Sequence, residues 1–175
     1  MKKNYNSAVF LDRDGVINID YGYIGTINRF ELIPGTIEAL KKIQDSGYLI
    51  IIITNQSGIG RDFFSSEDYE IVNEHMKSIL LNHNIHINGV YHCPHIPSDG
   101  CSCRKPEIGL IKKAISIHNI DCSKSILVGD KISDIQASNK AKISRCFYIG
   151  DSKISEKCSG IYKSLYQLVC EESVI

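Results

Sequence analysis

The chain has 175 residues, and its 20 lysines and arginines balance 20 aspartates and glutamates. This length suits one domain with a full hydrophobic core, so we expect a single domain over residues 1–175. The even charge offers no basic field for nucleic acid, and no apolar run approaches the roughly 20 residues that a membrane helix needs. No signal-peptide core precedes the first acidic residues, and we therefore expect a cytoplasmic protein. We also expect a monomer with a small-molecule substrate.

Apolar, β-branched runs alternate with amphipathic segments along the chain. The first predicted strand, 9–11, is followed by a loop over 19–30 and by a helix that begins at Thr36 as its N-cap and ends before Gly47. Further strands are predicted at 48–53, 85–91, 125–128 and 146–149, and further helices at 66–81, 107–118, 132–139 and 160–169. This alternation predicts an α/β fold, with a doubly wound parallel sheet and helices on both faces.

The first strand runs directly into Asp12-Arg13-Asp14-Gly15. Carboxylates two residues apart at the end of a strand point to the same side. Two acids so close cannot both ionise cheaply unless a cation lies between them or they share a proton. The pair is therefore a candidate site, although an Asp-Gly sequence is also typical of a solvated turn.

Two further polar residues, Thr54 and Asp130, also stand at the ends of predicted strands. Because parallel strands present their carboxyl ends at one edge of the sheet, these residues and Asp12 are expected to converge. In that arrangement Asp12 is a candidate nucleophile, Asp14 can give and take a proton, and Lys105 supplies a point charge. Carboxylate oxygens are ligands that Mg²⁺ prefers, so the set predicts magnesium-assisted phosphoryl transfer.

A cluster of cysteines in the segment 92–104 calls for a separate explanation. The candidate ligands are Cys93, His95, Cys101 and Cys103. Three thiolates and one imidazole form the ligand set of a closed, structural zinc site, which would order this zinc-binding loop and place Lys105 at the crevice. His92 competes with His95 as the fourth ligand, and reduced loop cysteines without a metal are the alternative interpretation.

The motifs together resemble the haloacid dehalogenase superfamily of phosphatases. The resemblance covers roughly residues 8 to 150 and rests on Asp12-x-Asp14-Gly15-Val16, Thr54, Lys105-Pro106 and Gly129-Asp130-x-x-x-Asp134. It implies a Rossmannoid fold, Asp12 as nucleophile, Asp14 as acid and base, and Thr54 and Lys105 as phosphate stabilisers. It also implies Mg²⁺ held by Asp12, the Asp14 carbonyl and Asp130. For Asp134, a metal-site role and a helix-dipole role stay open.

Within the superfamily, the zinc-binding loop and the segments 10–15, 54–59 and 103–106 are similar to the D,D-heptose 1,7-bisphosphate phosphatases and the related histidinol-phosphate phosphatases. The heptose resemblance implies removal of the 7-phosphate through an aspartyl phosphate, in the synthesis of nucleotide-activated heptose for lipopolysaccharide or other surface glycans. Histidinol phosphate is the alternative substrate, since the loop from His95 to Cys101 is short. A phospho-accepting switch is the alternative from another class.

No segment is long enough for a separate cap domain, so loops must select the substrate. The heptose resemblance implies contacts to sugar or phosphate from Asp20, Tyr23, Asn55, Gln56, Ser57, Arg104 and Lys131. Each of these polar side chains could instead be solvated loop surface. One departure from the family pattern lies at Arg61-Asp62, where Arg-Gly is usual.

Overall fold

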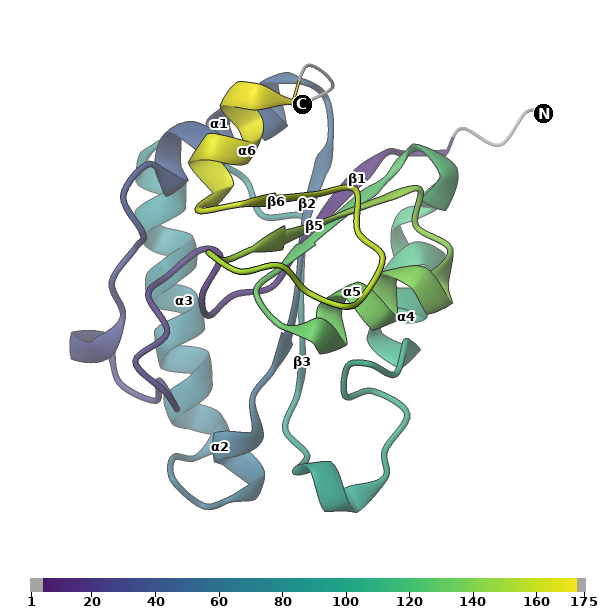
Figure 1. Ribbon diagram of the computed structural model, residues 1–175. Coiled ribbons are helices and arrows are strands. Elements are labelled where there is room, and N and C mark those ends of the chain that lie inside the picture. The colour runs from purple at the N-terminus through teal and green to yellow at the C-terminus, as the bar shows by residue number, and fades with distance from the viewer. Residues whose placement is uncertain (1–4, 173–175) are drawn as a thin grey trace.

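The computed structural model describes residues 5–172, in which six parallel strands form one sheet (Figure 1). The strands are β1 (Ala8–Leu11), β2 (Leu49–Asn55), β3 (Gly89–Cys93), β4 (Ile126–Gly129), β5 (Arg145–Ile149) and β6 (Gly160–Tyr162). They lie in the order β3-β2-β1-β4-β5-β6, so the winding reverses at β1. The predicted doubly wound parallel sheet is confirmed, with its crevice expected at the carboxyl end of β1.

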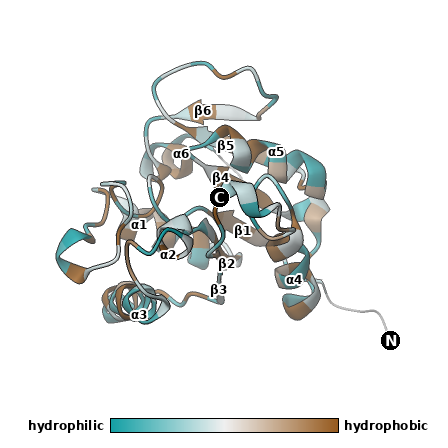
Figure 2. Ribbon diagram, turned by 90° about the horizontal axis from the view of Figure 1, so that it is seen from below, coloured by the Kyte–Doolittle hydropathy of each residue, from teal (hydrophilic) through white to brown (hydrophobic). Residues whose placement is uncertain are grey.

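Helices cover both faces of the sheet, as Figures 1 and 2 show from two directions. They are α1 (Thr36–Asp45), α2 (Ser57–Gly60), α3 (Ser66–Asn82), α4 (Gly109–His118), α5 (Ile132–Ala141) and α6 (Leu165–Glu171). Val9 and Leu11 share a core with α1, α3 and α6, whereas Ala8 and Phe10 share one with α4 and α5. Successive strand side chains point to opposite faces, which explains why β1 and β2 are apolar almost throughout.

The segment 160–169 differs from the predicted helix. Gly160–Tyr162 forms β6, which pairs with the edge of β5, and α6 starts only after Ser164. The Ser164 hydroxyl caps this helix by accepting a hydrogen bond from the backbone N–H of Gln167 at 3.1 Å. The strand predicted at 146–149 is therefore followed by one more strand. Local pattern assigns residues 160–162 to a helix, but the open edge of β5 offers them backbone hydrogen-bond partners.

Two predicted boundaries also shift. The strand expected at 85–91 is Gly89–Cys93, so Cys93 stands at the carboxyl end of a strand. The N-cap of α1 is Gly35, with a φ of 86°, and the Thr36 hydroxyl instead donates to the carbonyl oxygen of Ile17 at 3.0 Å. A glycine adopts this left-handed conformation without the steric cost of a Cβ atom.

The short helix α2 was not predicted, and it shapes the turn after β2. Asp62, at the position where the sequence departs from the family pattern, has a φ of 57°. Aspartate is among the few residues that tolerate this left-handed region, so Asp62 can adopt the conformation for which the family resemblance implies a glycine. Among residues 5–172 no group of elements stands apart from the sheet as a cap, and none of the described helices is long and apolar enough to cross a membrane.

Candidate active site and metal centres

A cavity of about 320 Å³ lies at the carboxyl ends of β1, β2 and β4. The structure brings every predicted catalytic and substrate-contact residue to its wall: Asp12, Asp14, Asp20, Tyr23, Thr54, Asn55, Gln56, Ser57, Arg104, Lys105 and Lys131. Asp12 follows β1, Thr54 lies at the end of β2, and Lys105 arrives from the segment before α4. Convergence of strand ends at the winding reversal thus assembles the site, and the roles of these residues stay predictions.

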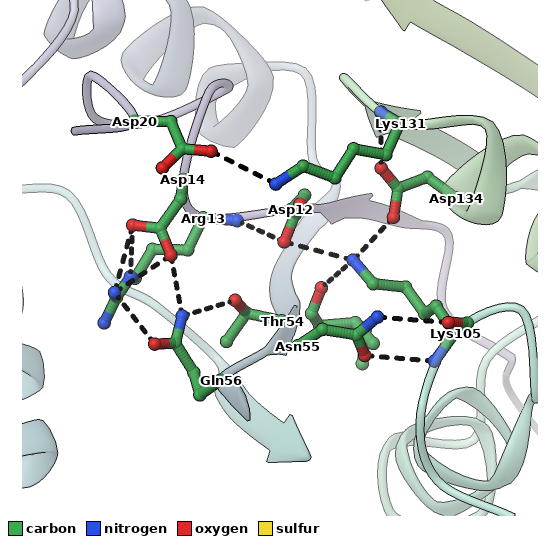
Figure 3. Close-up of polar contacts among 11 residues, drawn as sticks. Asp12, Arg13, Asp14, Asp20, Thr54, Asn55, Gln56, Lys105, Lys131 and Asp134 are labelled. Atoms are coloured by element: carbon green, nitrogen blue, oxygen red, sulfur yellow. Dashed lines mark hydrogen bonds and ion pairs between the residues drawn. The ribbon is translucent and has the colours of Figure 1, made fainter. Parts of the chain in front are cut away.

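Lys105 is a buried cation beside Asp12 (Figure 3). Its Nζ lies 3.0 Å from an Asp12 carboxylate oxygen and 2.7 Å from one of Asp134, and it donates to the carbonyl oxygen of Ile53 at 2.6 Å. Burial alone would lower the pKa of Lys105, but the charges of Asp12 and Asp134 outweigh it and raise the pKa. Lys105 therefore stays charged beside the candidate nucleophile.

Asn55 holds the main chain of Lys105 from the end of β2. Its Oδ1 accepts from the Lys105 backbone N–H at 3.0 Å, and its Nδ2 donates to the Lys105 carbonyl at 3.1 Å. Both polar ends of the amide are thus engaged by one residue. Asn55 consequently contributes to the placement of the lysine as well as to the cavity wall.

The Asp14 carboxylate points away from Lys105, toward a group of donors (Figure 3). It accepts from Arg13 Nη2 at 3.0 Å, from Asn18 Nδ2 at 2.9 Å and from Gln56 Nε2 at 2.7 Å. Gln56 Nε2 also donates to Thr54 Oγ1 at 2.8 Å. The hydroxyl proton of Thr54 is therefore free to be donated to a phosphate oxygen.

Arg13 is a member of the site that the sequence did not single out. Its side chain is fully buried, and its guanidinium lies 5.4 Å from the centre of the Tyr69 ring. A buried arginine needs a paired charge, which Asp14 supplies. The signal available in the sequence was a cation between two acids directly after a buried strand.

Asp130 and its neighbours form an oxygen-lined site that fits Mg²⁺. Carboxylate oxygens of Asp12, Asp130 and Asp134 lie within 4.8 Å of one another. Oδ1 of Asp130 is buried and has no hydrogen-bond partner among residues 5–172. A Cβ atom on Gly15 would lie 2.2 Å from Oδ2 of Asp130, so glycine is required for the carboxylate to approach β1. Hard oxygen donors with room for water are the set that Mg²⁺ takes.

The contacts of Asp134 are compatible with both roles left open by the sequence. Its Oδ2 accepts from the backbone N–H of Lys131 at 3.0 Å, at the start of α5, and its other oxygen pairs with Lys105. It is buried, with 1% of its surface exposed. Asp134 therefore supports the helix end, and its charge lies beside the carboxylates of the candidate magnesium site.

Stability of the metal-free protein is expected to fall as pH rises from about 4 to about 7. Burial and the charge of Asp12 raise the pKa of Asp130 from 3.8 to about 7. In this window the folded chain keeps a proton that the unfolded chain has lost, so folding weakens as pH rises. Denaturant unfolding in EDTA should show a loss on the order of 4 kcal/mol in the free energy of unfolding, which is smaller in Asp130→Asn and is offset by Mg²⁺. If the free energy of unfolding of the unaltered protein and of Asp130→Asn changed with pH in parallel, the raised pKa of Asp130 would be wrong.

The predicted zinc ligands come together as one cluster. The sulfur atoms lie 3.0 Å apart for Cys93 and Cys103, 3.6 Å for Cys93 and Cys101, and 3.4 Å for Cys101 and Cys103. His95 Nδ1 lies 3.2 Å from the Cys103 sulfur. His92 instead packs against Tyr69, with ring centres 4.2 Å apart and ring planes at 42°.

This geometry fits a tetrahedral zinc site. Zinc binds sulfur at about 2.3 Å and nitrogen at about 2.0 Å, which places neighbouring ligand atoms within roughly 4 Å of one another. Burial would raise the pKa of the Cys101 thiol, but hydrogen bonds from Cys103 and from the main chain lower it to about 6. A thiolate is the form that binds zinc. Burial raises the pKa of the Cys93 and Cys103 thiols, so these two would lose their protons as the metal binds.

Cys101→Ser is expected to release one zinc ion per chain and to lower the thermal unfolding midpoint by about 5 °C or more, because the loop would lose a ligand. Elemental analysis and thermal unfolding test this, with Cys122→Ser as the matched control outside the cluster. Absence of zinc from protein purified without chelator would refute the site.

Asp12, Asp14 and Lys105 lie beside an oxygen-lined cation site at the switch point of a parallel sheet. This arrangement is typical of metal-dependent phosphoryl-transfer enzymes. The family described as polynucleotide kinase 3 phosphatase matches residues 25–163. The chain belongs to this family within the haloacid dehalogenase-like phosphatases, and it is closely related to the heptose 1,7-bisphosphate 7-phosphatases.

Three relatives illustrate this relationship. D-glycero-beta-D-manno-heptose-1,7-bisphosphate 7-phosphatase of Haemophilus influenzae is 43% identical over 145 residues, which are 79% of this chain and 78% of that protein. D-glycero-alpha-D-manno-heptose-1,7-bisphosphate 7-phosphatase of Photorhabdus laumondii is 44% identical over 156 residues, which are 85% of this chain and 85% of that protein. The D,D-heptose 1,7-bisphosphate phosphatase of B. bronchiseptica, solved with magnesium and phosphate, has a TM-score of 0.85 at 24% identity, with 94% of this chain and 97% of that chain covered. This structural similarity supports the assignment of the fold.

Proposed function

We propose that the chain hydrolyses the 7-phosphate of D-glycero-D-manno-heptose 1,7-bisphosphate, in the synthesis of nucleotide-activated heptose for lipopolysaccharide. The observation that carries the proposal is the placement of Asp12, Asp14 and Lys105 in one cavity whose outer wall is built from the loops that resemble the heptose enzymes. Relatives of that name at 43% and 44% identity support the choice of substrate.

In the first step, a carboxylate oxygen of Asp12 attacks the phosphorus atom of the 7-phosphate. The bond from phosphorus to O7 breaks, Asp14 gives its proton to the departing O7, and an aspartyl phosphate forms. In the second step, the ionised Asp14 takes a proton from water, whose oxygen attacks the phosphorus and releases Asp12 and inorganic phosphate. Two easier displacements thus replace one difficult displacement.

Cationic and hydrogen-bond donors offset the negative charge of the transferring group. Lys105 lies beside Asp12, and the Thr54 hydroxyl is oriented by Gln56. Bound Mg²⁺, for which the carboxylates of Asp12 and Asp130 and the carbonyl of Asp14 are the proposed ligands, would supply further positive charge. Because phosphoryl transfer depends chiefly on positioning and charge, these groups supply most of the catalysis.

The rim of the cavity carries the proposed sugar contacts. Asp20 and Lys131 form an ion pair at 3.2 Å across it, and Arg104 donates to the carbonyl oxygen of His95 at 3.2 Å. The zinc-binding loop therefore holds Arg104 in place. We assign Asp20, Arg104 and Lys131 to the hydroxyls and the remaining phosphate of the substrate.

A three-substrate assay with Mg²⁺ tests the proposal. Phosphate release is measured from heptose 1,7-bisphosphate as each anomer, from histidinol phosphate and from a nucleotide, with Asp12→Asn as the background. We expect the heptose compound to give the highest kcat/KM. A clear preference for histidinol phosphate would refute the substrate assignment, and no turnover of any of them would favour a phospho-accepting switch.

Asp14→Asn is expected to lower kcat/KM for heptose bisphosphate by about 10²- to 10⁴-fold, because asparagine cannot protonate the alkoxide. The loss in kcat/KM for p-nitrophenyl phosphate should be smaller, since nitrophenolate leaves without an acid. Steady-state kinetics on both substrates provide the measurement. Full turnover of the heptose compound by Asp14→Asn would count against the mechanism.

A further inference from the structure

Phe63 is a large apolar side chain with 61% of its surface exposed, just outside the cavity. Its ring meets the ring of Tyr23 edge to face, with centres 4.7 Å apart and planes at 84°. We propose that Phe63 is a positioning residue for substrate selection, which holds the Tyr23 ring as an apolar wall against the sugar. This inference rests on the proposed function and adds a residue that the sequence motifs do not contain.

The backbone under Tyr23 is fixed, whereas its ring depends on the contact with Phe63. Tyr23 has a φ of 50°, and the Arg29 guanidinium donates to the carbonyl oxygens of Tyr21 at 2.6 Å and Gly22 at 3.0 Å. The Tyr23 ring is half-exposed, and the described part of the chain gives its hydroxyl no hydrogen-bond partner. Edge-to-face packing on Phe63 is therefore the contact that can select the orientation of the ring.

Phe63 itself is anchored in the turn that follows α2. Its backbone N–H donates to the carbonyl oxygen of Gly58 at 2.9 Å. The next ring, Phe64, lies against Gly25 and Gly58, where an added Cβ atom would come within 2.4 Å and 2.2 Å of it. The turn after α2 and the loop of Tyr23 are thus packed together, so the place of the Phe63 ring fixes the place of the Tyr23 ring that it contacts.

The apolar C–H groups and the hydroxyls of a sugar match the side chains near Tyr23. Tyr23 and Ser57 line the cavity, and Tyr23 is nearer to solvent than the buried Asp12. A substrate whose phosphate lies at Asp12 would extend its carbon skeleton outward, with C–H groups available to the ring and hydroxyls to polar neighbours such as Asp20. A phosphate compound without a sugar would not reach the ring, so Phe63 should affect sugar binding and leave phosphoryl transfer unchanged.

The test compares Phe63→Ala, Phe63→Tyr, Tyr23→Ala and the double alanine variant on heptose 1,7-bisphosphate and on acetyl phosphate. For Phe63→Ala we expect KM for the heptose compound to rise about 3- to 10-fold with kcat unchanged, and kcat/KM for acetyl phosphate to stay within about twofold. Phe63→Tyr, which keeps the ring, should restore the KM. The rise in KM for the double variant should be no larger than the rise for Tyr23→Ala alone, because the two residues act through one contact.

Ile71→Ala is the matched control, since Ile71 is an exposed apolar residue of α3 outside the cavity wall. It should leave the KM unchanged. An unchanged KM in Phe63→Ala, equal losses on both substrates, or additive losses in the double variant would overturn the inference. Failure of the unaltered protein to turn over the heptose compound would instead refute the proposed function, so the two failures are distinguishable.

Discussion

Replacing Asp12 by asparagine is expected to reduce phosphate release by a factor of at least about 10⁴, because the amide cannot form the aspartyl phosphate. The side chain is nearly buried at the end of β1, with one oxygen 3.0 Å from Lys105 Nζ and accepting from the Arg13 backbone N–H at 2.8 Å. An asparagine oxygen can accept both contacts, so the site should keep its shape. Loss of turnover would then reflect the missing nucleophile.

Stability provides the control for this variant. Asp12→Asn removes one charge from a group of acids that raises the pKa of Asp130, and the metal-free protein should be at least as stable as the unaltered one. Phosphate release and thermal unfolding in EDTA are measured together, with Asp20→Asn as the same chemical change at the rim. Residual turnover above about 1% of the unaltered rate in Asp12→Asn would point to a different nucleophile.

Replacing Lys105 by methionine is expected to lower both stability and activity. The lysine is buried between Asp12 and Asp134, and its removal leaves two buried carboxylates without their cation. Breaking a buried ion pair by removing one partner costs about 3–5 kcal/mol. The phosphate would also lose a charged donor, which we expect to reduce kcat by about 10²- to 10³-fold.

Denaturant unfolding and steady-state kinetics measure these two effects. Lys131→Met is the matched control, because Lys131 makes an exposed ion pair with Asp20 and its loss should cost less than about 1 kcal/mol. Saturating Mg²⁺ should recover part of the stability of Lys105→Met, since a bound cation again offsets the carboxylates. If the two variants proved equally stable without metal, the central role of Lys105 in this charge cluster would be wrong.

The main features of the site were predictable because they depend on local pattern. An apolar run followed by a polar residue marks the carboxyl end of a strand, and Asp12, Thr54 and Asp130 all stand there. Parallel strands bring such ends to one edge, whatever the loops between them do. The clustering of Cys93 and Cys103 was predictable for a related reason, since closely spaced thiols in one loop are suited to a common metal.

What the tertiary structure alone decided is which side chains touch across distant segments. The bridge from Gln56 to Asp14, the pairing of Asp134 with Lys105 and the edge-to-face contact of Phe63 with Tyr23 have no signature in local spacing. They depend on loop conformation and on rotamers set by packing. Likewise, β6 exists because β5 offers an open edge, a property of the assembled sheet and not of residues 160–162. The sequence therefore determined where the chemistry lies, and the packed structure determined how its parts are held.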